Sequence, residues 1–136
     1  MFSSETTLRV RYAETDQMGY VYYGNYATYY EVARVEALRL IGLSYKLFED
    51  NGIMMPVLNL HCKYHKPAKY DDLLTIKTTI KELPSVRIQF FYAVYNELGV
   101  LLNEGETTLV CIDMKTGRPC GSPKILIEKI SEYFKH

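Results

Sequence analysis

The period of the apolar positions changes along the chain, and each period predicts a different kind of element. From Asn25 to Gly42 the apolar residues recur at helical spacing, with Asn25 as a good N-cap and Gly42 just after the helix end. The face so defined consists of Tyr26, Tyr30, Ala33, Ala37, Leu40 and Ile41. Because Val32, Val35 and Leu38 widen the apolar surface beyond one stripe, we expect this helix to be buried on more than one side.

Alternating apolar and polar residues predict strands before and after this helix. The expected strands cover residues 8–12, 53–66, 74–81, 86–94 and 100–113, the last with a bulge at Gly105. A short helix is expected over residues 44–49, and a C-terminal helix is expected to begin with Ser122 as N-cap and Pro123 as first residue and to reach Tyr133. Short turns join the later strands, which indicates antiparallel pairing. The pattern therefore predicts an α+β fold, in which the helix of residues 25–41 covers the apolar face of one sheet.

Composition narrows the class of protein. A chain of 136 residues has the size of a single domain, and its 48% of hydrophobic residues excludes a disordered protein. Lys plus Arg and Asp plus Glu number 16 each, which argues against a general nucleic-acid binder but allows a local patch for a phosphate. We find no signal-peptide pattern and no apolar run near the roughly 18 residues of a membrane span.

The thiol and imidazole side chains give no sign of a metal site. The three cysteines are Cys62, Cys111 and Cys120. An odd number at wide spacing is typical of reduced thiols in a cytoplasmic protein, and their spacings to histidine give no zinc pattern. His61 and His65 share one face of an expected strand, where packing at an edge or interface is favoured over metal binding. The terminal His136 is expected to be disordered, and no metal or redox cofactor is predicted.

The segment of residues 14–24 reads as a turn and carries Asp16 just ahead of the helix. A carboxylate in this place is a poor choice for stability alone, but it suits chemistry, because the helix end supplies free N–H donors and a partial positive charge. Six of the 13 tyrosines lie between Tyr20 and Tyr30, so we expect an aromatic, partly dry wall around it. Taken alone, Asp16 is more often a turn or capping residue.

This stretch resembles the signature of the 4-hydroxybenzoyl-CoA thioesterase family of hotdog-fold enzymes. The matching run extends from Asp16 to Tyr26, and a helix that contains Glu31 and Arg34 follows it. Weaker likeness continues over residues 67–76, and the later spacing also fits, so the resemblance covers nearly the whole chain. It implies a curled antiparallel sheet wrapped around one long central helix, with a C-terminal helix, in a single hotdog thioesterase domain of residues 1–136.

The resemblance also implies roles for single residues. Asp16 occupies the position of the family's catalytic carboxylate, and Tyr23 and Gly24 occupy positions whose N–H groups hold the thioester oxygen. Asn25 either caps the helix, which is the favoured interpretation, or orients the site. The residues expected at the substrate are Gly19, Tyr22, Tyr26 and, for the phosphates of coenzyme A, Arg87, with Lys63, Lys66 and Lys69 as alternative cations.

Two further positions stay open in the sequence. Glu31 is interpreted as a buried partner of Arg34 rather than as a second acid. Among the tyrosines we expect Tyr22 or Tyr26, rather than Tyr29, to touch the substrate, because helical spacing turns Tyr29 to another face.

The expected function is hydrolysis of an acyl thioester of coenzyme A or of an acyl carrier protein, in the cytoplasm, by a homodimer or homotetramer. Asp16 would either attack the carbonyl carbon or activate a water, and the sequence does not choose between these. Within the fold the alternative is a dehydratase, which the absence of histidine from the first 60 residues disfavours. Outside enzymes the alternative is a non-catalytic acyl-binding or assembly protein, which an intact Asp16 disfavours.

Overall fold

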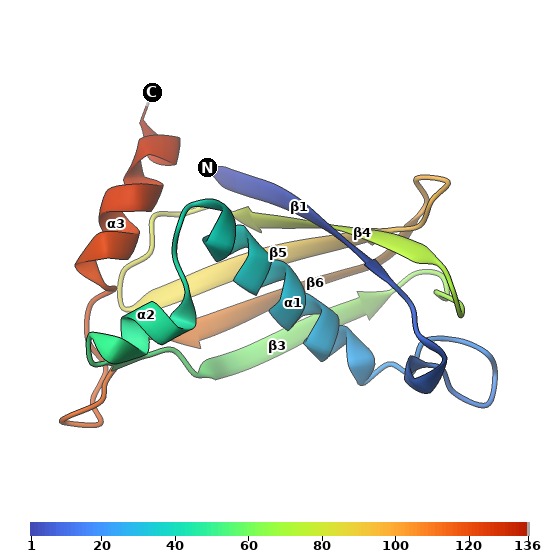
Figure 1. The fold of residues 1–136 in the computed structure, drawn as a ribbon, viewed down its shortest axis with the longest axis horizontal. Coiled ribbons are helices and arrows are strands. Elements are labelled where there is room, and N and C mark those ends of the chain that lie inside the picture. The colour runs from blue at the N-terminus through green and yellow to red at the C-terminus, as the bar shows by residue number, and fades with distance from the viewer. Residues whose placement is uncertain (136) are drawn as a thin grey trace.

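A five-stranded antiparallel sheet forms the body of the computed structural model, which describes residues 1–135 (Figure 1). The strands lie in the order β1-β4-β5-β6-β3, so β1 and β3 are its edges. Their bounds are β1 Phe2–Arg9, β3 Val57–Tyr64, β4 Leu73–Ile80, β5 Arg87–Tyr95 and β6 Leu101–Val110. All four pairings are antiparallel, which confirms the prediction from the short turns. His136 lies outside the described residues, and so does the prediction made for it.

The helix α1, Asn25–Leu40, lies across the inner side of the curled sheet (Figure 1). Its buried residues are Tyr26, Tyr29, Tyr30, Ala33, Arg34, Ala37 and Leu38. Of the three residues expected to widen the buried surface only Leu38 is buried, while Val35 is half-buried and Val32 is 39% exposed. The buried residues therefore form one broad face, and the expected burial on more than one side is wrong. Leu40 is 70% exposed, so the buried face ends earlier than the spacing predicted.

Gly42 ends α1 as predicted. It takes φ +81°, a left-handed conformation that favours glycine. The N–H of Leu43 then donates to the carbonyl of Leu38 at 2.9 Å, and the N–H of Gly42 donates to that of Arg39 at 3.0 Å. These two bonds form a Schellman motif, which satisfies carbonyls that the end of a helix otherwise leaves open.

The interpretation of Asn25 as the N-cap is wrong. Gly24 holds the N-cap position, and Asn25 is already the first helical residue. The Asn25 side chain donates from Nδ2 to the main-chain carbonyl of Glu14 at 2.8 Å, instead of accepting a bond from its own helix. The side chain therefore binds a distant carbonyl through its N–H group, in place of the local N–H donor that an N-cap oxygen would accept.

The two shorter helices lie at the same end of the sheet (Figure 1). Helix α2, Tyr45–Asp50, confirms the expected short helix but begins one residue later, because Ser44 is its N-cap, whose Oγ accepts the N–H of Leu47 at 3.1 Å. The strands expected over 53–66 and 100–113 are each divided, because β2 and β7 separate from β3 and β6 and form their own two-stranded ladder. The bounds of these short elements are β2 Ile53–Met54, β7 Ile112–Asp113 and α3 Lys124–Ile130.

Two predicted boundaries are wrong. The first strand, expected over residues 8–12, runs from Phe2 to Arg9, and Tyr12 instead opens a 3₁₀ turn, Tyr12–Glu14. Ser122 is not the N-cap of α3, because its hydroxyl donates to the carbonyl of Ser85, and α3 begins only at Lys124. After α3 a second 3₁₀ turn, Ser131–Phe134, continues to the end of the described chain.

The bulge expected at Gly105 is also absent from β6. Gly105 pairs in register with Cys62 on β3 and with Tyr92 on β5. Glycine is required at this position by packing, since a Cβ on residue 105 would overlap the hydroxyl of Tyr30. Tyr30 is fully buried, stacks on Tyr92 at 4.2 Å between ring centres and hydrogen-bonds the side chain of Asn103. The bare backbone at Gly105 therefore lets α1 approach the sheet closely.

The expected pair of Glu31 and Arg34 is not formed. Among the ion pairs of residues 1–135 none joins these two side chains, because Glu31 is exposed while Arg34 is 7% exposed and lies beside Tyr45 and Tyr92.

The described chain also holds no disulfide, since all three of its cysteines are free thiols. None of the helices in residues 1–135 is long and apolar enough to cross a membrane.

Candidate active site

Asp16 lies in a tight loop whose backbone holds one of its carboxylate oxygens. Oδ1 accepts the N–H of Met18 at 2.9 Å and the N–H of Tyr20 at 3.2 Å. The main chain closes the same loop, since the N–H of Asp16 donates to the carbonyl of Tyr20 at 2.7 Å and Gly19 takes φ +80°. Asp16 therefore does serve the turn. Its other oxygen, Oδ2, receives no hydrogen bond from residues 1–135 and is open to a substrate or a water.

A hollow of about 300 Å³ lies against this carboxylate. Its wall combines the loop, the start of α1 and the end of β3, and it contains four tyrosines. The side chains that matter most below are Asp16, Tyr20, Tyr23, Tyr26, Tyr64 and Lys66. Burial raises the pKa of Tyr26 to about 12, so its hydroxyl stays protonated at neutral pH. The sequence thus correctly expected an aromatic wall around Asp16.

Two backbone donors remain unused where α1 begins. The N–H of Asn25 donates to the carbonyl of Tyr22 at 2.9 Å, and the N–H of Tyr26 donates to that of Tyr23 at 3.3 Å. The N–H groups of Tyr23 and Gly24 donate to no acceptor in residues 1–135. Since Tyr23 lines the same hollow as Asp16, at least one of these unused donors belongs to a residue of the hollow's wall.

Gly24 is also required by packing. A Cβ at Gly24 would lie 2.7 Å from Cε2 of Tyr22, whose ring covers this position. The Tyr22 ring rests against that of Tyr23 at 4.6 Å and is 45% exposed, outside the lining of the hollow. The structure therefore brings Tyr26 to the hollow and leaves Tyr22 beside it.

The cations expected at the substrate are divided among different places. Lys66 lines the Asp16 hollow. Lys63 lines a larger hollow of about 460 Å³, whose lining shares no residue with the first. Arg87 opens β5 next to the end of β4, whereas the Asp16 loop contacts Ala68 and Lys69, just ahead of β4. Within one chain the nine-residue length of β5, roughly 30 Å, separates Arg87 from the Asp16 end of the sheet.

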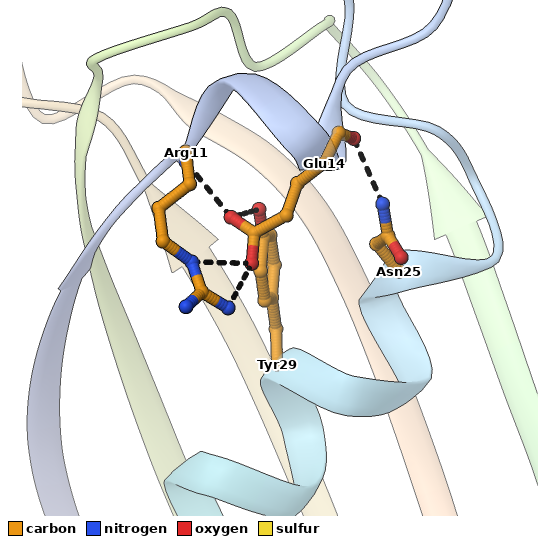
Figure 2. Close-up of polar contacts among 4 residues, drawn as sticks. All are labelled: Arg11, Glu14, Asn25 and Tyr29. Atoms are coloured by element: carbon orange, nitrogen blue, oxygen red, sulfur yellow. Dashed lines mark hydrogen bonds and ion pairs between the residues drawn. The ribbon is translucent and has the colours of Figure 1, made fainter.

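Glu14, which the sequence analysis passed over, is the most fully bonded carboxylate near the site (Figure 2). Its Oε1 accepts the main-chain N–H of Arg11 at 2.8 Å and the hydroxyl of Tyr29 at 3.0 Å. Its Oε2 accepts Nε and a terminal nitrogen of the Arg11 guanidinium at 3.2 Å and 2.8 Å. The spacing of Arg11 and Glu14, three residues apart, was the one signal in the sequence for this contact.

The surroundings of Glu14 favour its charged form. Partial burial alone would raise the pKa of this carboxyl, but the hydrogen bonds from Arg11 and Tyr29 outweigh it and hold the pKa below its ordinary value. Tyr29 is 2% exposed, and both burial and the bond to Glu14 raise the pKa of its hydroxyl, so it remains a donor. Tyr29 thus turns away from the hollow, as expected, but toward a carboxylate.

His61 lies in β3 and His65 directly after it, and neither belongs to a cluster within residues 1–135 that could hold a metal ion. His65 lies 2.8 Å from Glu104 through its Nε2, and it also borders the Asp16 hollow. Among residues 1–135 no group of three or more His, Cys, Asp or Glu side chains is placed to hold a metal ion.

Comparison with known proteins defines the class. Residues 10–130 match the family described as the thioesterase-like superfamily. The acyl-CoA thioester hydrolase YbgC of Escherichia coli is 32% identical over 125 residues, which cover 92% of this chain and 93% of that one. The solved DHNA-CoA thioesterase of Staphylococcus aureus has a TM-score of 0.84 and 37% identity, covering 98% of this chain and 85% of that one. A 4-hydroxybenzoyl-CoA thioesterase variant, solved with 4-hydroxybenzoyl-CoA, has a TM-score of 0.83 and 25% identity, covering 94% and 98%.

A curled antiparallel sheet with α1 on its inner side, and solved thioesterases as close structural neighbours, place the molecule among the hotdog-fold thioester hydrolases. The chain belongs to the thioesterase-like superfamily, in its group of acyl-CoA thioesterases, which confirms the resemblance seen in the Asp16 to Tyr26 run.

Proposed function

We propose that this chain hydrolyses an acyl-CoA thioester in the hollow beside Asp16. The observation that carries the proposal is that Asp16, with its free Oδ2, and Tyr23, with its unused N–H, line the same hollow. The N–H groups of Tyr23 and Gly24 hold the oxyanion that develops on the thioester oxygen. One such donor typically lowers the barrier by about 3–4 kcal/mol. Asn25 orients the site through Glu14 rather than through the substrate.

Asp16 has two chemically sensible roles, and both use Oδ2. As a nucleophile it attacks the thioester carbon, the thiolate of coenzyme A leaves, and water then hydrolyses the resulting anhydride. As a general base it takes a proton from a water that attacks the same carbon. The bonds from Met18 and Tyr20 hold the other oxygen in either case, so the reactive oxygen keeps a fixed direction.

The substrate is expected to meet three parts of the site. Tyr26 and Gly19 shape the hollow and its loop, and Lys66 is the cation nearest to the reacting centre. Arg87 meets the same coenzyme only if the nucleotide end extends along the sheet or the residue comes from a second subunit. Tyr22 contributes by packing over Gly24 rather than by lining the hollow.

The larger setting completes the proposal. The whole chain of residues 1–136 acts as one hotdog domain whose long central helix is α1, and two or four copies assemble. The hollow supports assembly, because Tyr64 at the open edge of β3 forms part of its wall. The free thiols support a cytoplasmic site of action.

A thiol-release assay tests the function. Acyl-CoA esters of increasing length, aryl-CoA esters and acyl carrier protein thioesters are each incubated with the protein, and the freed thiol is measured. We expect turnover of at least one coenzyme A thioester. Binding of these esters without thiol release would instead support a non-catalytic acyl-binding protein.

The matched variant for this assay is Asp16→Asn. Asparagine keeps the Oδ1 acceptor for the N–H groups of Met18 and Tyr20 but removes the charge. We expect kcat to fall at least ~10²-fold, as is usual when a positioned acid or base is lost. A folded Asp16→Asn protein, with an unchanged melting temperature and near wild-type turnover, would contradict the mechanism.

A further inference from the structure

Glu14 is held to α1 at both ends of the residue. Its carboxylate accepts the hydroxyl of Tyr29, while its main-chain carbonyl accepts Nδ2 of Asn25 at 2.8 Å (Figure 2). The same carbonyl also accepts the N–H of Tyr22 at 2.9 Å. Asn25 and Tyr29 are four residues apart, so they lie on one face of the helix, one turn above the other. Two contacts from one helix face fix both the distance and the rotation of the segment that carries Glu14.

Asp16 follows Glu14 by two residues, and its side chain forms no hydrogen bond with α1 in residues 1–135. The bonds to its carboxylate come from Met18 and Tyr20, inside its own loop. The free N–H groups of Tyr23 and Gly24 stand at the start of α1 instead. The distance between the carboxylate and these donors therefore depends on how the loop is tied to the helix, and Glu14 supplies that tie.

We propose that Glu14, through Tyr29 and Asn25, is the positioning residue that sets Asp16 at its working distance from the helix N-terminus. This inference rests on the proposed hydrolysis. A shift of about 1 Å between reacting groups can cost as much as 10²-fold in rate. The bond between the charged Glu14 and the buried hydroxyl of Tyr29 is of the stronger, charge-assisted kind, so it resists such a shift.

Arg11 completes the arrangement from the other side. Its guanidinium and main-chain N–H occupy the remaining lone pairs of the Glu14 carboxylate. The Arg11 side chain is 79% exposed, so solvent screens its charge, and the buried hydroxyl of Tyr29 is the contact that joins loop to helix. Tyr29→Phe is therefore the sharpest change, because it keeps the ring and removes only that hydroxyl.

A double-mutant cycle tests the proposal by thiol release from the best acyl-CoA substrate. We expect Tyr29→Phe to lower kcat roughly 10-fold with KM unchanged within about twofold. In an Asp16→Asn background the same change should lower the residual rate less than about twofold, since there is no reactive carboxylate left to position. Equal losses in both backgrounds would mean general damage to the fold and would overturn the proposal, as would full activity of Tyr29→Phe.

The matched control is Tyr12→Phe, which removes a tyrosine hydroxyl in the same segment. The side chain of Tyr12 is 79% exposed, so its hydroxyl is in solvent, and we expect wild-type kcat and KM. A loss in Tyr12→Phe as large as that in Tyr29→Phe would also overturn the assignment.

A second measurement does not depend on activity. The N–H groups of Met18 and Tyr20 report on the Asp16 loop by amide hydrogen exchange, and Tyr29→Phe should speed their exchange while leaving the amides of β5 unchanged. Unchanged exchange at Met18 and Tyr20 would overturn the positioning role. If the wild-type protein hydrolyses no thioester, the proposed function fails, and this exchange result still decides whether Glu14 holds the loop.

Discussion

At the scale of single residues, the site contains two carboxylates, two positions apart, with different surroundings. Asp16 keeps one oxygen open to the hollow, whereas both oxygens of Glu14 are occupied. The first arrangement suits a group that must react, and the second suits a group that must stay charged and hold its neighbours. Within this loop Asp16 is therefore placed to react, and Glu14 is placed to hold its neighbours.

The lowered pKa of Glu14 predicts how stability depends on pH. A carboxyl whose folded-state pKa lies below its unfolded value of about 4.5 stabilises the fold above that value, and this contribution disappears as pH falls through the folded pKa. Glu14→Gln lacks the contribution at every pH. We therefore expect the variant to melt below the wild type at pH 7, and the difference to shrink steadily below pH 4.5.

Thermal melting of both proteins between pH 7 and pH 3 checks this expectation. Glu5→Gln, on the outer face of β1, is the matched control and should show a smaller difference at pH 7. A gap between wild type and Glu14→Gln that stays constant over the whole range would contradict the assignment of the charge.

The sequence pointed to Asp16 as a candidate and gave little sign of Glu14, for a physical reason. Asp16 can be recognised as a candidate from its neighbours along the chain, which are the turn glycines and the start of a helix. The role of Glu14 depends on its bonds to Asn25 and Tyr29. These residues lie 11 and 15 positions away and contact Glu14 only after the loop has folded back. The same long-range bond explains why Asn25 is not the helix cap that its residue type predicted.

At the scale of elements, local signals predicted what local bonds decide. The end of α1 before Gly42 and the start of α2 depend on contacts within a few residues. The first was predicted correctly, and the second was predicted one residue early, at the N-cap Ser44. The start of β1 was missed because Ser4 and Thr6 occupy inward positions of the alternation. Their polarity hid a strand that its pairing with β4 stabilises.

Gly105 is the clearest case of an element shaped by its neighbour. We expect Gly105→Ala to destabilise the protein by roughly 1–3 kcal/mol, because the new Cβ meets the Tyr30 ring, which the stack on Tyr92 holds in place. Chemical denaturation measures the loss. Gly121→Ala, where a Cβ meets nothing within 4 Å, is the control. Equal stability of the two variants would show that Tyr30 can move aside.

At the scale of the whole molecule, the inner face of the sheet is covered unevenly. On β4 and β5 the inward side chains are buried, as at Ile76 and Phe90. On β3, which is an edge, Leu60 shares the inward face with Cys62 but is 41% exposed, and Leu58, at the register shift of this strand, is 49% exposed. An apolar edge strand with open backbone groups favours pairing with another chain.

We therefore predict a symmetric dimer that forms along β3, alone or within a tetramer. Light scattering at micromolar concentration should give at least twice the 15.8 kDa of one chain. Leu60→Lys places a charge in the uncovered apolar row of each copy and should shift the mass toward 15.8 kDa. Leu98→Lys, at a turn position that is 87% exposed, should keep the mass of the wild type.

Because Tyr64 at the end of β3 also lines the Asp16 hollow, Leu60→Lys should lower thiol release together with the mass. A wild-type mass of one chain, or a Leu60→Lys protein that assembles like the wild type, would show that β3 is not the seam.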